Sequence, residues 1–203
     1  MLTGTTRRSR RHCALGSQRP GVSPLVDSLR GGRVVALGHW DRFPTRSDTW
    51  RRVPLNMKLE EWTDLLDVGM RKGGLAIMLV TGTTINERLH TAVLKAIAER
   101  LANSSLIALN VGEVDATQDA YDALALALAH PSCIVGHLYI RDPVSVEDRE
   151  YKRKVRGLLR HNRTKDAYLE VLARDEVWQL RGANCWFNFN QSLRTRALNW
   201  KCK

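Results

Sequence analysis

Short apolar runs alternate along this chain with longer stretches that carry apolar residues at helical spacing. Each run is rich in β-branched or aliphatic residues and predicts a strand. The predicted strands span 33–38, 76–81, 106–111 and 135–140. Between and after them, apolar residues recur every three or four positions, as on one face of a helix. The predicted helices span 59–70, 84–101, 115–128, 145–159 and 164–180.

The last three strand–helix units repeat one arrangement at intervals of about thirty residues. In each, an apolar-x-apolar strand leads through a turn to a helix-capping residue. Thr84-x-x-Glu87 and Asp115-x-x-Gln118 fit the capping-box pattern, and Ser145 is a candidate cap. This repetition predicts an α/β architecture in which parallel strands lie side by side. The stretch 39–56 predicts a long loop.

Three regions of different composition divide the chain. Residues 1–31 are rich in Arg, Ser, Gly and Thr without hydrophobic periodicity, and they predict a flexible basic arm. Residues 32–164 hold the repeating units. Residues 165–203 predict a C-terminal helical cap, which covers the last apolar face of a stacked array, and a basic aromatic tail.

The segment 124–140 resembles the leucine-rich repeat of the ribonuclease-inhibitor type. It reads Leu-Ala-Leu-Ala-Leu-Ala-His-Pro-Ser-Cys-Ile-Val-Gly-His-Leu-Tyr-Ile, a helix end followed by a turn and a Leu-x-x-Leu-x-Leu-like strand. Leu106, Leu109 and Val111 match the same strand pattern one unit earlier. The Asn that normally follows the strand in that family is missing here. The resemblance implies a short solenoid with parallel strands inside and helices outside, and a non-catalytic scaffold for protein–protein interaction.

In such a solenoid, the strand side chains between the buried positions line the concave face. Tyr and Arg are frequent anchors at interfaces. The partner-binding candidates are therefore Leu79, Asn110, His137, Tyr139 and Arg141. The alternative is that this face is only the solvent side of a sheet.

Charge divides the chain further. The net charge is +11, distributed as about +6 over residues 1–33, −4 over 34–150 and +9 over 151–203. Basic ends of this kind favour contact with a polyanion or an acidic partner, although a solvated charged face explains them too. The polyanion-binding candidates are Arg7, Arg8, Arg10, Arg11, Lys152, Arg153, Lys154 and Arg156. The arm alone fits a nuclear signal, a phosphate-binding segment or an organelle transit peptide.

No pattern in the sequence predicts a catalytic centre, a metal site or a cofactor. The four cysteines and six histidines show no metal-ligand or redox spacing, which favours reduced thiols in an intracellular protein. No apolar run is long enough to cross a membrane. The Thr83-Thr84 turn leaves an α/β enzyme with a phosphate site as a remote alternative.

The sequence thus predicts an intracellular, non-catalytic scaffold or accessory subunit whose partners are other protein subunits with acidic surfaces. The cytoplasm, the nucleus and the mitochondrion all remain open as its compartment. The alternative of a different class is a protein that associates with nucleic acid through its basic N- and C-terminal segments.

Overall fold

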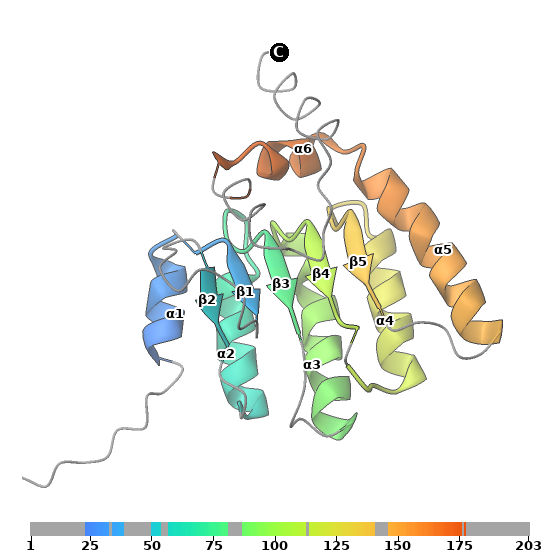
Figure 1. Cartoon of the computed structure of the whole chain (residues 1–203), viewed down its shortest axis with the longest axis horizontal. Helices are drawn as coiled ribbons and strands as arrows, with labels where there is room; N and C mark the ends of the chain where they lie inside the picture. The colour runs from blue at the N-terminus through green and yellow to red at the C-terminus, as the bar shows by residue number, and fades with distance from the viewer. Residues whose placement is uncertain are drawn as a thin grey trace, which may run out of the picture.

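The computed structural model describes residues 23–32, 34–38, 50–53, 57–80, 87–112, 114–140, 146–175 and 177. These residues form a parallel sheet with helices on both of its faces (Figure 1). The strands are β1 (Ala36–Gly38), β2 (Trp50–Arg52), β3 (Ile77–Leu79), β4 (Ala108–Asn110) and β5 (His137–Tyr139). The helices are α1 (Ser23–Arg30), α2 (Leu59–Gly69), α3 (Glu87–Arg100) with a 3-10 turn (Leu101–Asn103), α4 (Gln118–Ala129), α5 (Val146–Asn162) and α6 (Asp166–Leu172).

Strands β3, β4 and β5 lie side by side in chain order and run parallel. Leu79 is paired with Asn110, and Asn110 with Tyr139. The ladder extends one residue further, because the Val80 N–H donates to the Asn110 carbonyl and the Val111 N–H to the Tyr139 carbonyl, both at 2.8 Å. The predicted α/β class and the predicted adjacency of these strands are therefore confirmed.

Strand β2 was not predicted, because 39–56 was interpreted as a loop. It pairs parallel to β1 on the outer edge of the sheet, which gives the order β2-β1-β3-β4-β5. Its sequence, Trp50-Arg51-Arg52, has no apolar alternation and so gives no strand signal of its own. The backbone pairing to β1 defines it instead.

Helices α1 to α5 form one layer on one face of the sheet. Each contacts the next along the chain, α1 with α2 and so on to α5 (Figure 1). Alternate strand residues point into this layer, as the two-residue period of a strand requires. They include Leu37, Met78, Leu109 and Val135, each at most 1% exposed.

Helix α1 corrects the predicted flexible arm (1–31) over residues 23–31, whereas residues 1–22 lie outside the described part of the chain. Leu25, Val26 and Leu29 of this helix are buried in the same core as α2. Pro24 stands in the first turn of the helix, where proline is well tolerated. The folded part of the chain therefore starts no later than Ser23, and the short length of α1 hid its periodicity.

The other face of the sheet is apolar as well, and α6 covers it. Val35, Ile77, Ile107 and Ile134 point to this face and pack with Tyr168, Leu169, Val171 and Leu172. A helix thus exists in the predicted C-terminal span, but α6 ends at Leu172 and the residues 176 and 178–180 lie outside the described part of the chain. It runs across the amino-terminal ends of the strands (Figure 1). Strands that are apolar on both sides need cover on both sides.

Two basic side chains tie the ends of α6 to turns at the amino ends of the strands. The Lys165 Nζ donates to the carbonyls of Pro131 at 2.8 Å and Cys133 at 2.6 Å, in the turn after α4. The Arg174 Nη1 donates to the Gly74 carbonyl at 3.2 Å, in the turn after α2. Cations suit these turns because they follow helix C-termini, where the helix dipole is negative.

Asn162, the last residue of α5, joins three elements from a buried position. It is 1% exposed. Its Nδ2 donates to the carbonyl of Leu128 at 3.1 Å, at the end of α4, and to the carbonyl of Val135 at 3.0 Å, before β5. Both carbonyls belong to fully buried residues, so this one amide satisfies polar groups that water does not reach.

We expect Asn162→Ala to lower the free energy of unfolding by about 2–4 kcal/mol, because it leaves these two buried carbonyls without the Nδ2 donor. Urea unfolding followed by circular dichroism measures the loss. The exposed Asn103→Ala is the matched control and should stay within about 0.5 kcal/mol of the wild type. A loss below about 1 kcal/mol for Asn162→Ala would contradict this role of the amide.

Candidate functional site

The five predicted partner-binding residues do not form one exposed surface. Leu79 and Asn110 are only 3% and 2% exposed. Leu79 packs against Gly38 on β1, where a Cβ atom would stand 3.0 Å from the Leu79 Cβ. Arg141 lies outside the described residues. The pairing of Leu79, Asn110 and Tyr139 across the sheet agrees with the predicted row, but the first two side chains are not accessible to a partner.

The side chain of Asn110 stabilises the turn that follows β4. Its Oδ1 accepts a hydrogen bond of 2.9 Å from the Gly112 N–H, which closes the turn after β4. The leucine-rich-repeat pattern places an Asn after the strand, and here the strand's own last residue makes such a bond. Tyr139 is the exposed member of the row, at 38%. Its ring lies over Gly112, at a place that a side chain on residue 112 would occupy.

His137 points to the face that α6 covers. Its Nε2 lies 2.9 Å from the Tyr168 hydroxyl. Burial, and secondarily the charge of Arg163, lower the pKa of His137 to about 4. The imidazole is therefore neutral near pH 7 and adds no positive charge to a surface for an acidic partner.

A second histidine connects the starts of α3 and α4 at the carboxyl edge of the sheet. His90 is 3% exposed. Its Nδ1 accepts a hydrogen bond of 2.9 Å from the Asp115 N–H, which leaves the ring proton on Nε2. Burial lowers the pKa of His90, and Nε2 has no partner in the described part of the chain. A lone neutral imidazole of this kind makes no acid–base pair.

Helix α4 starts later in the chain than predicted, and hydrogen bonds of two threonines lie at its start. The Thr117 N–H donates to the Thr91 Oγ1 at 3.0 Å, and the Thr117 hydroxyl donates to Asp119. Thr117 is therefore the N-cap of α4, and the predicted capping residue Asp115 lies outside the helix. The predicted Thr83-Thr84 turn, the Thr84-x-x-Glu87 box and Ser145 all fall wholly or partly outside the described residues.

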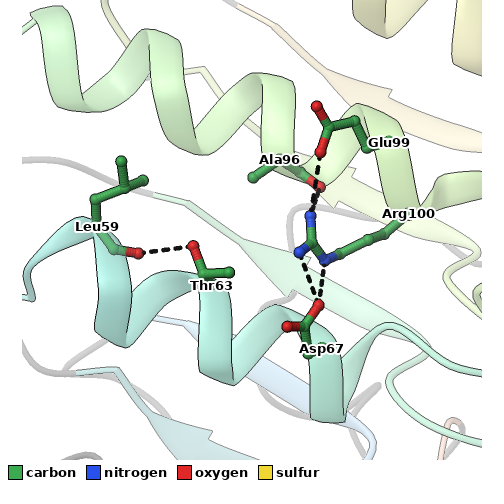
Figure 2. A network of polar contacts seen from close by, with 6 residues as sticks. All are labelled: Leu59, Thr63, Asp67, Ala96, Glu99 and Arg100. Carbon is green, nitrogen blue, oxygen red and sulfur yellow. Dashed lines mark hydrogen bonds and ion pairs between the residues drawn. The ribbon is translucent and has the colours of Figure 1, made fainter.

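On the outer surface of the helical layer, Arg100 of α3 makes polar contacts with α2. Its Nε and Nη2 each lie 2.7 Å from the Asp67 Oδ1 on α2, and its Nη1 donates to the Ala96 carbonyl at 2.8 Å and lies 3.5 Å from Glu99 (Figure 2). One guanidinium thus links α2 to α3.

The outer surface between α3 and α4 is apolar and open. A hollow of about 500 Å³ lies between these helices. Its floor is made of small side chains, and Leu126, which is 77% exposed, stands at its side. The lining residues are Lys95, Ala98, Glu99, Ala102, Ala123, Leu126, Ala127 and His130. Leu126 was not among the predicted site residues, although it lies in an apolar run from 123 to 129.

A second hollow of about 500 Å³ lies beside α6. Three of its polar groups bond within the protein: the Ser105 Oγ accepts from the Gly73 N–H at 2.7 Å, the Ser104 hydroxyl donates to the Leu101 carbonyl at 3.0 Å, and Arg174 bonds to Gly74. These bonds stabilise the turns beside α6. We therefore interpret the second hollow as a feature of how α6 packs on the rest of the protein.

The predicted basic residues of α5 lie on its surface. Arg153, Lys154 and Arg156 are exposed and Lys152 is partly exposed. The four arginines of the arm, Arg7, Arg8, Arg10 and Arg11, fall outside the described residues.

Within the described ranges, no group of three His, Cys, Asp or Glu side chains is placed to hold a metal ion. Within the same ranges, no helix is both long and apolar enough to span a membrane.

The comparisons with known proteins give no match: no protein family, no curated protein and no solved structure is significantly similar to this chain. The resemblance to leucine-rich repeats therefore remains a proposal. The surfaces themselves carry the argument about function.

We expect the free energy of unfolding to fall as the pH drops from 7 to 5. His137 has a pKa of about 4 in the folded state against 6.5 in the unfolded chain, so the unfolded state binds more protons in this window. The lowered pKa of His90 acts in the same direction. His137 alone contributes about 2 kcal/mol of the loss between these two pH values.

Urea unfolding of the wild type and of His137→Gln at pH 7 and pH 5 measures this contribution. The glutamine keeps a polar partner for Tyr168 and removes the titration. The exposed Asn103→Ala, which changes no titratable group, should keep the full pH dependence. An equal fall in the wild type and in His137→Gln would show that the pKa of His137 is not depressed in the folded protein.

Proposed function

We propose that this chain is a non-catalytic interaction scaffold, an accessory subunit of an intracellular assembly. Three consecutive strand–helix units, β3–α3, β4–α4 and β5–α5, support a short repeat of the leucine-rich-repeat kind. Ile77, Ala108 and His137 occupy equivalent places on neighbouring strands at intervals of 31 and 29 residues. The second interval is at the upper limit of the about 20–29 residues of that repeat and the first is slightly above it. The buried free thiol of Cys133, whose pKa burial raises, suits a reducing compartment.

The observation that carries the proposal is the apolar outer face of α4. From Ala123 to Ala129 this helix has seven apolar residues in succession, so its last two turns are apolar on every side. A helix that is hydrophobic all round is usually buried. Leu124 and Leu128 face the core, yet Leu126 is 77% exposed. Among the residues that the structure describes, none covers this part of a helix whose composition is typical of a protein interior.

The occupant that fits this hollow is an amphipathic helix of a partner protein. The hollow lies between two helices, and its alanine floor permits a third helix to approach closely. Binding of this type places apolar residues of the partner into a groove. The nearby charges are already engaged, because Lys95 pairs with Asp119 and Glu99 lies near Arg100, which leaves apolar contact as the main attraction.

We expect Leu126→Gln to weaken partner binding by about 10- to 100-fold, because the partner then no longer buries a full leucine side chain. A photo-cross-linking residue at position 126 of the full chain, used in the source cells, identifies the partner and its contact peptide. Binding of that partner to purified wild type and Leu126→Gln is then measured by calorimetry.

Leu59→Gln is the matched control, since Leu59 is also an exposed leucine, at 38%, in the first turn of α2. It should leave the affinity unchanged. Equal affinities of the wild type and Leu126→Gln, or a contact peptide without apolar residues, would show that the hollow is not the docking surface.

A further inference from the structure

The outer face of α5 carries four arginines in a straight row. Arg149, Arg153, Arg156 and Arg160 are all exposed, and their spacing of four, three and four residues keeps them within about 60° of one helix face. The row is about 16 Å long at the rise of an α-helix. We call these four residues the arginine row.

The packing of α5 fixes the direction of the arginine row. Val155 and Leu159 are buried, about 130° and about 90° around the helix from the middle of the row. The Tyr151 hydroxyl donates to the Tyr121 carbonyl at 3.0 Å. Buried Asn162 holds the end of the helix. Since α4 is its neighbour in the helical layer and α5 is the last helix of that layer (Figure 1), the arginine row faces away from the protein.

Little negative charge balances this face. Residues 149–163 contain seven Arg or Lys and one acid, Glu150, a net charge of +6. The two other acids of the helix, Glu147 and Asp148, belong to its first turn. Arg153 is 81% exposed and lies 3.5 Å from Glu150. Lys154, Arg156 and Arg160 form no ion pair with any residue that the structure describes.

The composition of the face favours nucleic acid over an acidic protein. Protein interfaces normally have an apolar centre, and none of the exposed large apolar side chains of the described residues is on α5. Interfaces with nucleic acid are polar and strongly positive, and arginine binds phosphate with two parallel hydrogen bonds. One DNA strand carries a phosphate for every 3.4 Å of the duplex axis, so a row of about 16 Å is long enough to contact several phosphates.

Gly157 stands beside the middle of the row, between Arg153 and Arg160. Glycine inside a helix is destabilising by about 0.5–1 kcal/mol relative to alanine. A Cβ atom at this position would contact nothing within 4 Å, so packing within the protein does not require the glycine. Its absent side chain leaves room for a sugar–phosphate backbone to come close to the helix.

We propose that the arginine row of α5 binds the phosphodiester backbone of a nucleic acid. This activity goes beyond the proposed scaffold function and uses a different surface from the α3–α4 hollow. Binding is set by charge and shape and requires no base contact. Either function stands if the other fails.

The test measures binding of the full chain to labelled 20-base-pair RNA and DNA duplexes by fluorescence anisotropy at several salt concentrations. We expect Arg153→Gln/Arg156→Gln/Arg160→Gln to weaken binding at least about 10-fold and to lower the slope of log K against log salt by about 2–3, one phosphate contact per arginine. Circular dichroism confirms that the variant is folded.

The matched control removes the same number of charges at the other end of the helical layer. Arg30→Gln/Arg71→Gln/Lys72→Gln changes exposed cations at the ends of α1 and α2 and should weaken binding less than about 3-fold. Equal losses in both triple variants would overturn the proposal, because net charge alone would then explain binding. An unchanged salt slope in the arginine variant, or tighter binding of polyglutamate than of either duplex, would overturn it as well.

Gly157→Leu separates this role from a structural one. Leucine has a higher helix propensity than glycine, so we expect the melting temperature to rise. The new side chain keeps every charge but fills the place of close approach, so affinity for the duplexes should fall several-fold. A rise in stability with unchanged affinity would show that the backbone does not approach α5 at Gly157.

Discussion

The fold depends on strands that are short and apolar on both sides. The three inner strands of the sheet, β1, β3 and β4, are each three residues long and fully buried. In β3, for example, Met78 packs on one face and Ile77 on the other. Burial of apolar surface is the main favourable term in folding, so neither face can remain in water. Five helices cover one face and α6 covers part of the other, and this division decides which surfaces are left for function.

The sequence predicts the part of this arrangement that arises from local periodicity. The strands around Met78, Leu109 and Leu138 and the helices that follow them were predicted from spacing alone, and their parallel order followed from repetition. Strand β2 was missed, since Arg51 and Arg52 give no local signal and backbone pairing to β1 defines it. Helix α1 was missed because eight residues give too short a periodic pattern.

The exposure of the predicted partner-binding residues could not be predicted in the same way, because it depends on how the whole chain packs around the sheet. The strand pattern placed Leu79, Asn110 and Tyr139 in one row, and the register agrees. The pattern alone does not tell how much of that face another part of the chain covers, and the first two residues are buried. The exposed basic positions of α5 can be predicted from the sequence, because Val155 and Leu159, four residues apart, mark the buried side of an amphipathic helix.

The two outward surfaces are adjacent because α4 and α5 are neighbours in one layer. Leu126 belongs to a mainly apolar face whose charged side chains are paired within the protein, and Arg156 belongs to a charged face without exposed large apolar side chains. Apolar burial is short-ranged and set by shape, whereas charge attracts over about 10 Å at moderate salt. Buried Asn162 ties the end of α5 to the end of α4, so the two faces keep one relative orientation. A rigid pair of this kind would hold a protein helix and a phosphate backbone side by side, which is the geometry that a scaffold in a nucleoprotein assembly requires.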